Sequence, residues 1–363
     1  MIPSRLRTFV ALLLTLCGAS GVAASQMTAD FQQFLNQGLG LTQAQIADIE
    51  SGKPVAKEMA ARTPDEVLLI GVVFIRATPE SYLRFATDLE RKRTQPGTLG
   101  FGIFSDPPQL AELRGFAFDD ADLDSLKDCR PGACSVQMPA SYIRGLQQGI
   151  DWSSSEVGAR VNAGLQQGVL DLLRAYKQDG NKAFGTYDDK HHSTDVARQF
   201  AYLLSYSRAL PTTLPEFYTY LLEYPNSKPA NVDDTFYWEH VKFGLKPTLR
   251  VVHMMVWHGQ ESAPVAYAVA QKQLYASHYF ETALDLSFCV RSADPRQTGS
   301  YLIMALGSEQ RGLSGFKGSI VRNAAVGRSV SSLQRGLLYA KSRLESAGNT
   351  SALRQSSGKD NKQ

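Results

Sequence analysis

The chain has 363 residues, and 43% of them are apolar, which is enough for a sizeable hydrophobic core. Lys and Arg number 38 against 35 Asp and Glu, and removal of an N-terminal segment that contains Arg5 and Arg7 leaves 36 basic residues. A net charge so close to zero argues against nucleic acid, which would need a strongly basic surface, so we expect no nucleic acid as a partner.

Residues 1–24 have the pattern of a cleavable secretory signal peptide. Two arginines precede an apolar run over 9–16, and small residues stand just before Ser25. The apolar run is too short to span a bilayer, so we expect no stable transmembrane anchor after cleavage. Lipid attachment at Cys17 is an alternative, although Leu16 is bulky where such signals have a small residue. We expect an exported protein, periplasmic if the source is a Gram-negative bacterium.

Three cysteines remain after Cys17 is removed. Cys129 and Cys134 flank a Pro-Gly pair that favours a turn, so in an oxidising compartment they predict a disulfide. A redox or metal site is the alternative, but the four-residue spacer is not the redox spacing and further metal ligands would be needed. We therefore expect no metal and no cofactor, and we interpret Cys289 as a small buried hydrophobe.

The first half of the exported chain predicts strands and short helices. Residues 66–76 are apolar and rich in β-branched side chains, which predicts a buried strand. Thr78 and Pro79 then supply the N-cap and first-turn proline of a helix. Residues 97–118 predict two short strands. The aspartates of 119–128 predict a solvated loop, because the segment lacks the glycine and glutamate that a calcium-binding loop requires.

The second half predicts a helical block, a series of strands and one long helix. Apolar residues at helical spacing predict helices over 140–224. Strand patterns with apolar or aromatic residues on both faces then follow at 235–243, 248–258, 263–277, 278–290 and 299–306. A stripe from Val326 to Leu344, at steps of three and four, predicts a long amphipathic helix that packs on the sheet. Residues 346–363 are polar and aperiodic, so we expect a disordered tail.

This order of elements resembles the helix-grip fold of the START-related lipid-transfer and polyketide-cyclase superfamily. The resemblance is carried by residues 67–89, a strand that runs into a capped helix, and by residues 235–344, antiparallel strands that end in a long helix. The helical block departs from the compact family plan. The resemblance implies a curved sheet closed by the last helix over a cavity that binds an apolar small molecule.

The fold class that we expect is therefore α+β: a curved antiparallel sheet packed against a long C-terminal helix, with an inserted helical block. A single domain is expected over 25–345, with helix-grip-like parts at 66–120 and 234–345 and the insertion at 140–224.

Polar residues that interrupt the strands are the best indication of a binding surface. A buried histidine or carboxylate is costly unless it is paired or lines water, so plain pairing or exposure is the alternative for each such residue. The candidate ligand-binding residues, taken from the polar, aromatic and sulfur-containing side chains of these strands, are Trp238, His253, Met255, Trp257, Tyr275, His278 and Glu281.

No catalytic residue can be assigned from the sequence. Neither Ser277 nor Ser314 lies in a nucleophile-elbow motif, and the histidines do not occur in a helical zinc-binding pattern. His278 and Glu281 are the pair to consider for acid–base chemistry, although a straight strand would point them to opposite faces.

Three functions stand as hypotheses. The first is an exported protein that binds a lipid or other apolar small molecule in a cavity between the sheet and the C-terminal helix. The second is an enzyme that uses the same cavity. The third is an envelope protein that docks a protein partner through its helical block.

Overall fold

The computed structural model describes residues 27–357, except 190–192, 243–245, 294–297, 311 and 314. The predicted signal peptide over 1–24, with Cys17, lies outside the described residues. The last six residues of the predicted tail do so as well.

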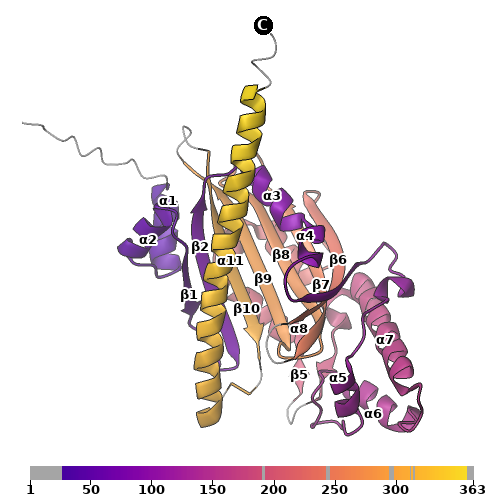
Figure 1. Ribbon diagram of the computed structural model, residues 1–363. Coiled ribbons are helices and arrows are strands. Elements are labelled where there is room, and N and C mark those ends of the chain that lie inside the picture. The colour runs from indigo at the N-terminus through magenta and orange to yellow at the C-terminus, as the bar shows by residue number, and fades with distance from the viewer. Residues whose placement is uncertain are drawn as a thin grey trace, which may run out of the picture.

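Within the described part of the chain, eight strands form one antiparallel sheet in the order β1-β2-β10-β9-β8-β7-β6-β3 (Figure 1). The strands are β1 Val55–Met59, β2 Glu66–Ile75, β3 Thr98–Ile103, β6 Val232–Lys242, β7 Pro247–His258, β8 Val265–Ala276, β9 Thr282–Arg291 and β10 Ser300–Glu309. A separate hairpin joins β4 Thr186–Tyr187 to β5 Thr194–Asp195. The predicted α+β fold with a large antiparallel sheet is confirmed.

Helices cover both faces of this sheet (Figure 1). The face that we call the front carries α3 Pro79–Thr87, α4 Leu89–Arg93 and α11 Gly315–Ser357. The back face carries three helices that precede β1, two short helices that follow β3, and the predicted helical block. Its members are α1 Ala29–Gln33, η1 Phe34–Gly38, α2 Gln43–Glu50, η2 Leu110–Leu113, α5 Asp120–Leu126, α6 Ala140–Gly149, α7 Val157–Asp179, η3 Gly180–Ala183, α8 Val196–Ser205, α9 Leu210–Thr213 and α10 Pro215–Glu223. None of the described helices is both long and apolar enough to cross a bilayer.

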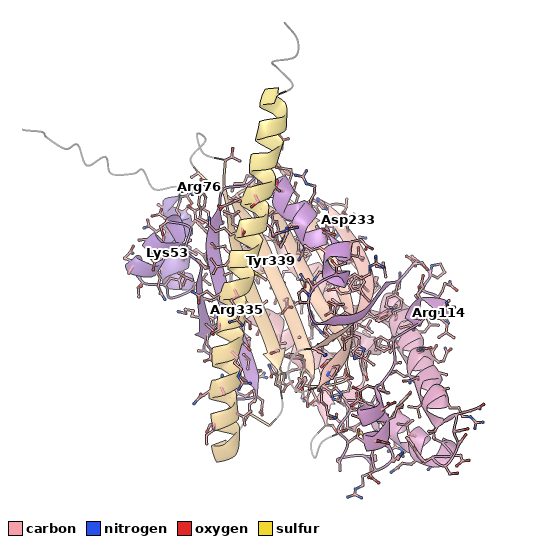
Figure 2. The ribbon with its side chains drawn as sticks, in the orientation of Figure 1. Lys53, Arg76, Arg114, Asp233, Arg335 and Tyr339 are labelled. Carbon is pink, nitrogen blue, oxygen red and sulfur yellow. A yellow bond between two sulfur atoms is a disulfide. The ribbon has the colours of Figure 1, made fainter. Side chains whose placement is uncertain are left out.

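The long C-terminal helix packs as its apolar stripe predicts. Leu333 and Leu337 are buried against β2, where a Cβ on Gly71 would lie only 3.0 Å and 2.7 Å from their side chains. The absence of a side chain at Gly71 therefore lets α11 approach the sheet closely. The other side of the helix carries exposed residues such as Arg335 and Tyr339 (Figure 2). The helix continues to Ser357, into the segment expected to be a disordered tail.

Two local predictions differ from the structure. Residues 97–118 contain one strand, β3, and the segment after it forms η2, where the Glu112 carboxylate accepts hydrogen bonds from the Ser105 and Gln109 backbone amides. The acidic segment 119–128 was expected as a solvated loop, but it contains helix α5, with Asp119 as its N-cap. Asp122 is buried in that helix, because it is paired with a histidine across the fold.

Candidate functional site

The residues chosen from the strand patterns lie on the side of the sheet that faces the helical block. Trp238, Met255 and Tyr275 belong to the back-face core, with Trp257 packed against it. His253 is fully buried in the same layer. They do not lie between the sheet and α11, where the sequence-based hypothesis placed the cavity. Strand alternation identifies two faces, but when both faces are apolar it does not say which helix covers which.

Trp238 has a packing role. Its indole Nε1 donates a hydrogen bond to the Glu112 carbonyl oxygen at 2.7 Å, and its ring lies over the glycines of β3. A Cβ on Gly102 would lie 2.2 Å from Nε1. The glycines in β3 therefore make room for this ring.

His278 and Glu281 lie at the turn between β8 and β9 and have separate partners. His278 Nε2 lies 2.9 Å from Asp122 Oδ2, and His278 Nδ1 lies 3.1 Å from the Ser135 carbonyl oxygen. The Glu281 carboxylate accepts a hydrogen bond from Thr194 Oγ1. Burial would raise the pKa of Asp122, but its contacts with His278 and Lys246 lower it. The ion pair between Asp122 and His278 therefore connects α5 to the turn between β8 and β9.

His253 is the centre of a buried chain of polar side chains, which we call the back-face relay: Asp234, His253, Tyr176, Lys272 and Asn181. His253 Nε2 lies 2.9 Å from Asp234 Oδ1, and His253 Nδ1 lies 3.1 Å from Tyr176 Oη. A carboxylate only accepts, so Nε2 carries the hydrogen and Nδ1 accepts from the tyrosine hydroxyl. Lys272 Nζ in turn donates to Tyr176 Oη at 3.2 Å and to Asn181 Oδ1.

The relay holds an ionised carboxylate beside a neutral histidine. Burial would raise the pKa of Asp234, but hydrogen bonds from His253, Lys228 and Tyr220 hold that pKa at about 2. Burial lowers the pKa of His253 to about 4 against the influence of Asp234. At neutral pH Lys272 therefore donates to Tyr176, Tyr176 donates to His253, and His253 donates to Asp234.

Lys272 is the most unusual member of the relay. Its side chain is fully buried among aromatic rings, with Nζ 3.8 Å from the Phe200 ring centroid and 4.9 Å from that of Phe184. Among the described residues no carboxylate pairs with it, and burial lowers its pKa well below the usual value. Sequence reasoning missed this residue. A signal was present, because Lys272 alternates with Ala268, Ala270 and Leu274 on the inward face of a strand.

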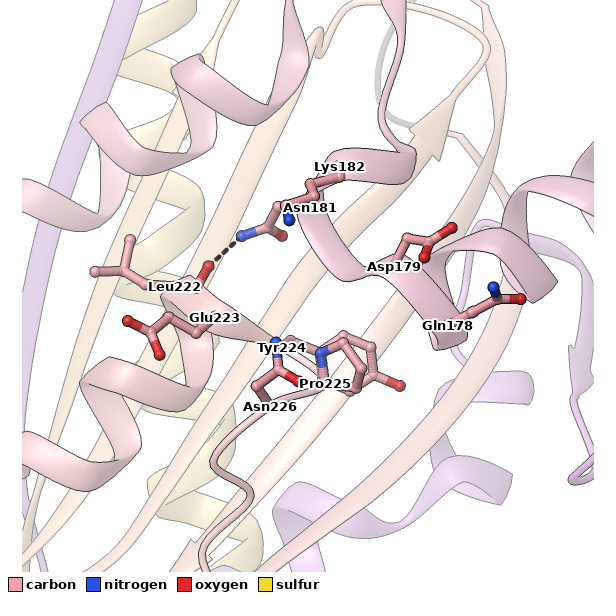
Figure 3. A pocket seen from close by; sticks show the side chains of 9 residues that line it. All are labelled: Gln178, Asp179, Asn181, Lys182, Leu222, Glu223, Tyr224, Pro225 and Asn226. Atoms are coloured by element: carbon pink, nitrogen blue, oxygen red, sulfur yellow. Dashed lines mark hydrogen bonds between the residues drawn. The ribbon is translucent and has the colours of Figure 1, made fainter.

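A hollow of about 460 Å³ opens to solvent next to this relay (Figure 3). It lies between η3 and the end of α10 and is lined by Gln178, Asp179, Asn181, Lys182, Leu222, Glu223, Tyr224, Pro225 and Asn226. Asn181 Nδ2 donates to the Leu222 carbonyl oxygen at 2.6 Å, while its Oδ1 accepts from Lys272. The Tyr224 ring stacks on Tyr176 at 4.6 Å. Asn181 and Tyr224 therefore belong both to the hollow and to the surroundings of the relay.

The front face carries a second group of polar side chains, which we call the front-face band: Lys92, Glu239, Arg250, Gln271 and Asp285. Arg250 Nη1 lies 2.8 Å from Glu239 Oε1. Lys92 Nζ donates to Gln271 Oε1 at 2.8 Å and so ties α4 to β8. This band lies on the face of the sheet that α3, α4 and α11 flank.

Asp285 differs from the other members of the band. Its side chain is half-buried, and none of the described residues donates a hydrogen bond to it. Burial raises the pKa of this carboxyl, although Arg250 and Lys92 oppose the shift. It stands beside half-buried apolar residues of the same face, Met304, Leu306 and Val330. A half-buried acceptor beside an incompletely covered apolar surface can receive a donor from a bound molecule.

The predicted disulfide is present. Cys129 and Cys134 are joined, and Cys289 is buried with a free thiol. No protein-family model and no curated protein matches this sequence, so the geometry of the two faces carries the functional interpretation.

Proposed function

We propose that this protein is an exported binding protein for a lipid or other apolar small molecule, which it holds on the front face of the sheet beside α11. The observation that carries the proposal is the combination of half-buried apolar side chains with Asp285, whose carboxylate receives no hydrogen bond from the described residues. Leaving such a group without a partner costs free energy. A bound molecule that covers Leu306 and donates to Asp285 would recover both losses.

The arrangement of the elements supports the same proposal. The structure has a strand, β2, followed by α3 and α4, and antiparallel strands that end in the long helix α11, which is the order of elements on which the helix-grip resemblance rests. The helical block is inserted between β3 and β6 and covers the back face. The insertion therefore does not occupy the front face, where α3, α4 and α11 lie and where we place the ligand.

Export is part of the proposal. A disulfide between Cys129 and Cys134 is compatible with an oxidising compartment, and residues 1–24 have the pattern of a signal peptide. N-terminal sequencing of the protein recovered from the cell envelope tests this directly. Cleavage before Ser25 is the expected result, and an intact N-terminus on soluble intracellular protein would contradict export.

Ligand binding is tested by native mass spectrometry of the protein purified from its own envelope. We expect an additional mass that organic solvent extracts. Leu306→Glu should abolish this mass, because it places a charge on the half-buried apolar surface. Leu338→Glu is the matched control, since this leucine of α11 is 47% exposed, and the variant should retain the ligand. A wild-type protein that carries no extractable molecule and binds no fluorescent fatty-acid probe would refute the proposal.

A further inference from the structure

The back-face relay contains a feature that the proposed function does not use, a fully buried lysine that pairs with no carboxylate among the residues that the structure describes. Lys272 has only neutral hydrogen-bond partners among the described residues, Tyr176 and Asn181. A buried amine is costly for the fold, because it must be held in its uncharged form. The uncharged amine is also the form that attacks carbonyl groups.

We propose that Lys272 is a nucleophilic amine that forms an imine with a small hydroxylated aldehyde or ketone bound in the hollow beside Asn181. The hollow is lined largely by polar side chains, among them Lys182, Glu223 and Asn226, which suit a hydroxylated molecule better than an apolar one. The Asn181 side chain contacts the amine from the wall of this hollow. Rotation of that side chain would uncover Nζ.

The relay supplies the proton transfers that imine formation needs. Nζ bonds to the carbonyl carbon, and the electron pair of the C=O double bond moves to oxygen. The proton lost by Nζ passes to Tyr176 Oη, while the tyrosine proton moves to His253 Nδ1, where Asp234 balances the new positive charge. The proton returns to the alkoxide oxygen and gives the carbinolamine. The second Nζ proton then passes through Tyr176 to the carbinolamine hydroxyl, the C–O bond breaks, and water departs as the C=N bond forms.

Reductive trapping of the full-length exported protein tests the inference. Glycolaldehyde and cyanoborohydride are added at neutral pH, and peptide mapping by mass spectrometry locates the modified lysines. We expect Lys272 to be modified first, faster than Lys182 on the wall of the hollow. Lys53→Met, at a surface lysine whose side chain is 70% exposed and which does not line the hollow, should leave this labelling unchanged. Asn181→Ala should accelerate labelling of Lys272 about tenfold or more, because it removes the side chain that stands between the amine and the hollow.

The result that would overturn the inference is labelling of surface lysines with Lys272 unmodified, both in the wild-type protein and in Asn181→Ala. Because the modified lysines are mapped in the wild-type chain, the test needs no substitution of Lys272 itself. Imine formation at Lys272 is independent of the proposed function, because binding of an apolar ligand on the front face is measured separately by native mass spectrometry. Ligand binding can therefore fail while imine formation at Lys272 succeeds, and the reverse.

Discussion

Each face of the sheet carries a half-buried aspartate, and the two aspartates differ in the hydrogen-bond donors around them. On the back face, Asp234 is hydrogen-bonded to His253, Lys228 and Tyr220. On the front face, none of the described residues donates a hydrogen bond to Asp285. A carboxylate with a full set of hydrogen bonds stabilises the fold around it, whereas one without a donor lowers the stability. A destabilising carboxylate that the sequence keeps therefore points to a functional role at that position. The faces therefore differ in what substitution of their carboxylates should do.

The largest effect is expected at Asp234. Asp234→Ala should lower the free energy of unfolding by roughly 3–5 kcal/mol, because it leaves the donors of His253 and Tyr220 buried without an acceptor. Urea denaturation followed by circular dichroism measures the change.

The neighbouring residue provides a matched control. Asp233 also contacts a histidine, His258, at 2.8 Å, but its side chain is 77% exposed. Asp233→Ala should therefore change stability by no more than about 1 kcal/mol. Equal effects at the two positions would show that pairing on the back face does not support the fold.

The pH dependence of stability comes next in size. The pKa of His253 is about 4 in the folded protein and near 6.5 when exposed, so the unfolded chain binds more protons in between. Stability should be fully present above pH 6.5 and fall by about 3 kcal/mol as pH decreases to 4. The pKa of Asp234 is about 2, below this window, so Asp234 stays ionised throughout.

Variants separate the contribution of His253 from those of other groups. The charged and titratable neighbours of His253 are Asp234, Tyr176, Tyr224, Lys272 and Lys177. His253→Gln should flatten the slope of stability between pH 4.5 and 6.5, whereas His258→Gln on the surface should not. His240, whose pKa burial also lowers, and carboxyls such as Asp122, whose pKa the fold lowers, contribute to the slope that remains. An unchanged slope in His253→Gln would contradict a buried neutral histidine.

Periodicity predicted most of the fold, because each strand and the final helix bury a regular pattern of side chains. The stripe from Val326 to Leu344 predicted a long helix that packs on the sheet, and the structure confirms this packing. The candidate site was not predictable in the same way. His253 was singled out as a polar interruption, but its partner Tyr176 comes from a helix far away in the chain. Lys272 was passed over because a lysine in a strand is usually solvent-exposed.

A glycine on the front face tests how closely α11 is held. Gly71→Ala should lower the free energy of unfolding by about 1–3 kcal/mol, because the new methyl group would overlap Leu333 and Leu337. Gly336→Ala on α11 is the control, since no atom of the surroundings lies within 4 Å of its added methyl group. That change should raise stability by up to about 1 kcal/mol through helix propensity. Thermal unfolding of both variants measures the difference, and a stabilised Gly71→Ala would contradict close packing of α11.

The smallest change in the free energy of unfolding is expected at Asp285. Its sign should be opposite to that of the change at Asp234. Asp285→Leu should raise the free energy of unfolding of the ligand-free protein by about 1 kcal/mol, because it removes a half-buried carboxylate that no described residue satisfies. The same variant should retain less of any apolar molecule that carries a hydroxyl or amine, because the acceptor is lost. Chemical denaturation and native mass spectrometry measure the two changes. A loss of stability as at Asp234 would mean that Asp285 is satisfied within the fold, and the proposed binding face would then lose the observation that supports it.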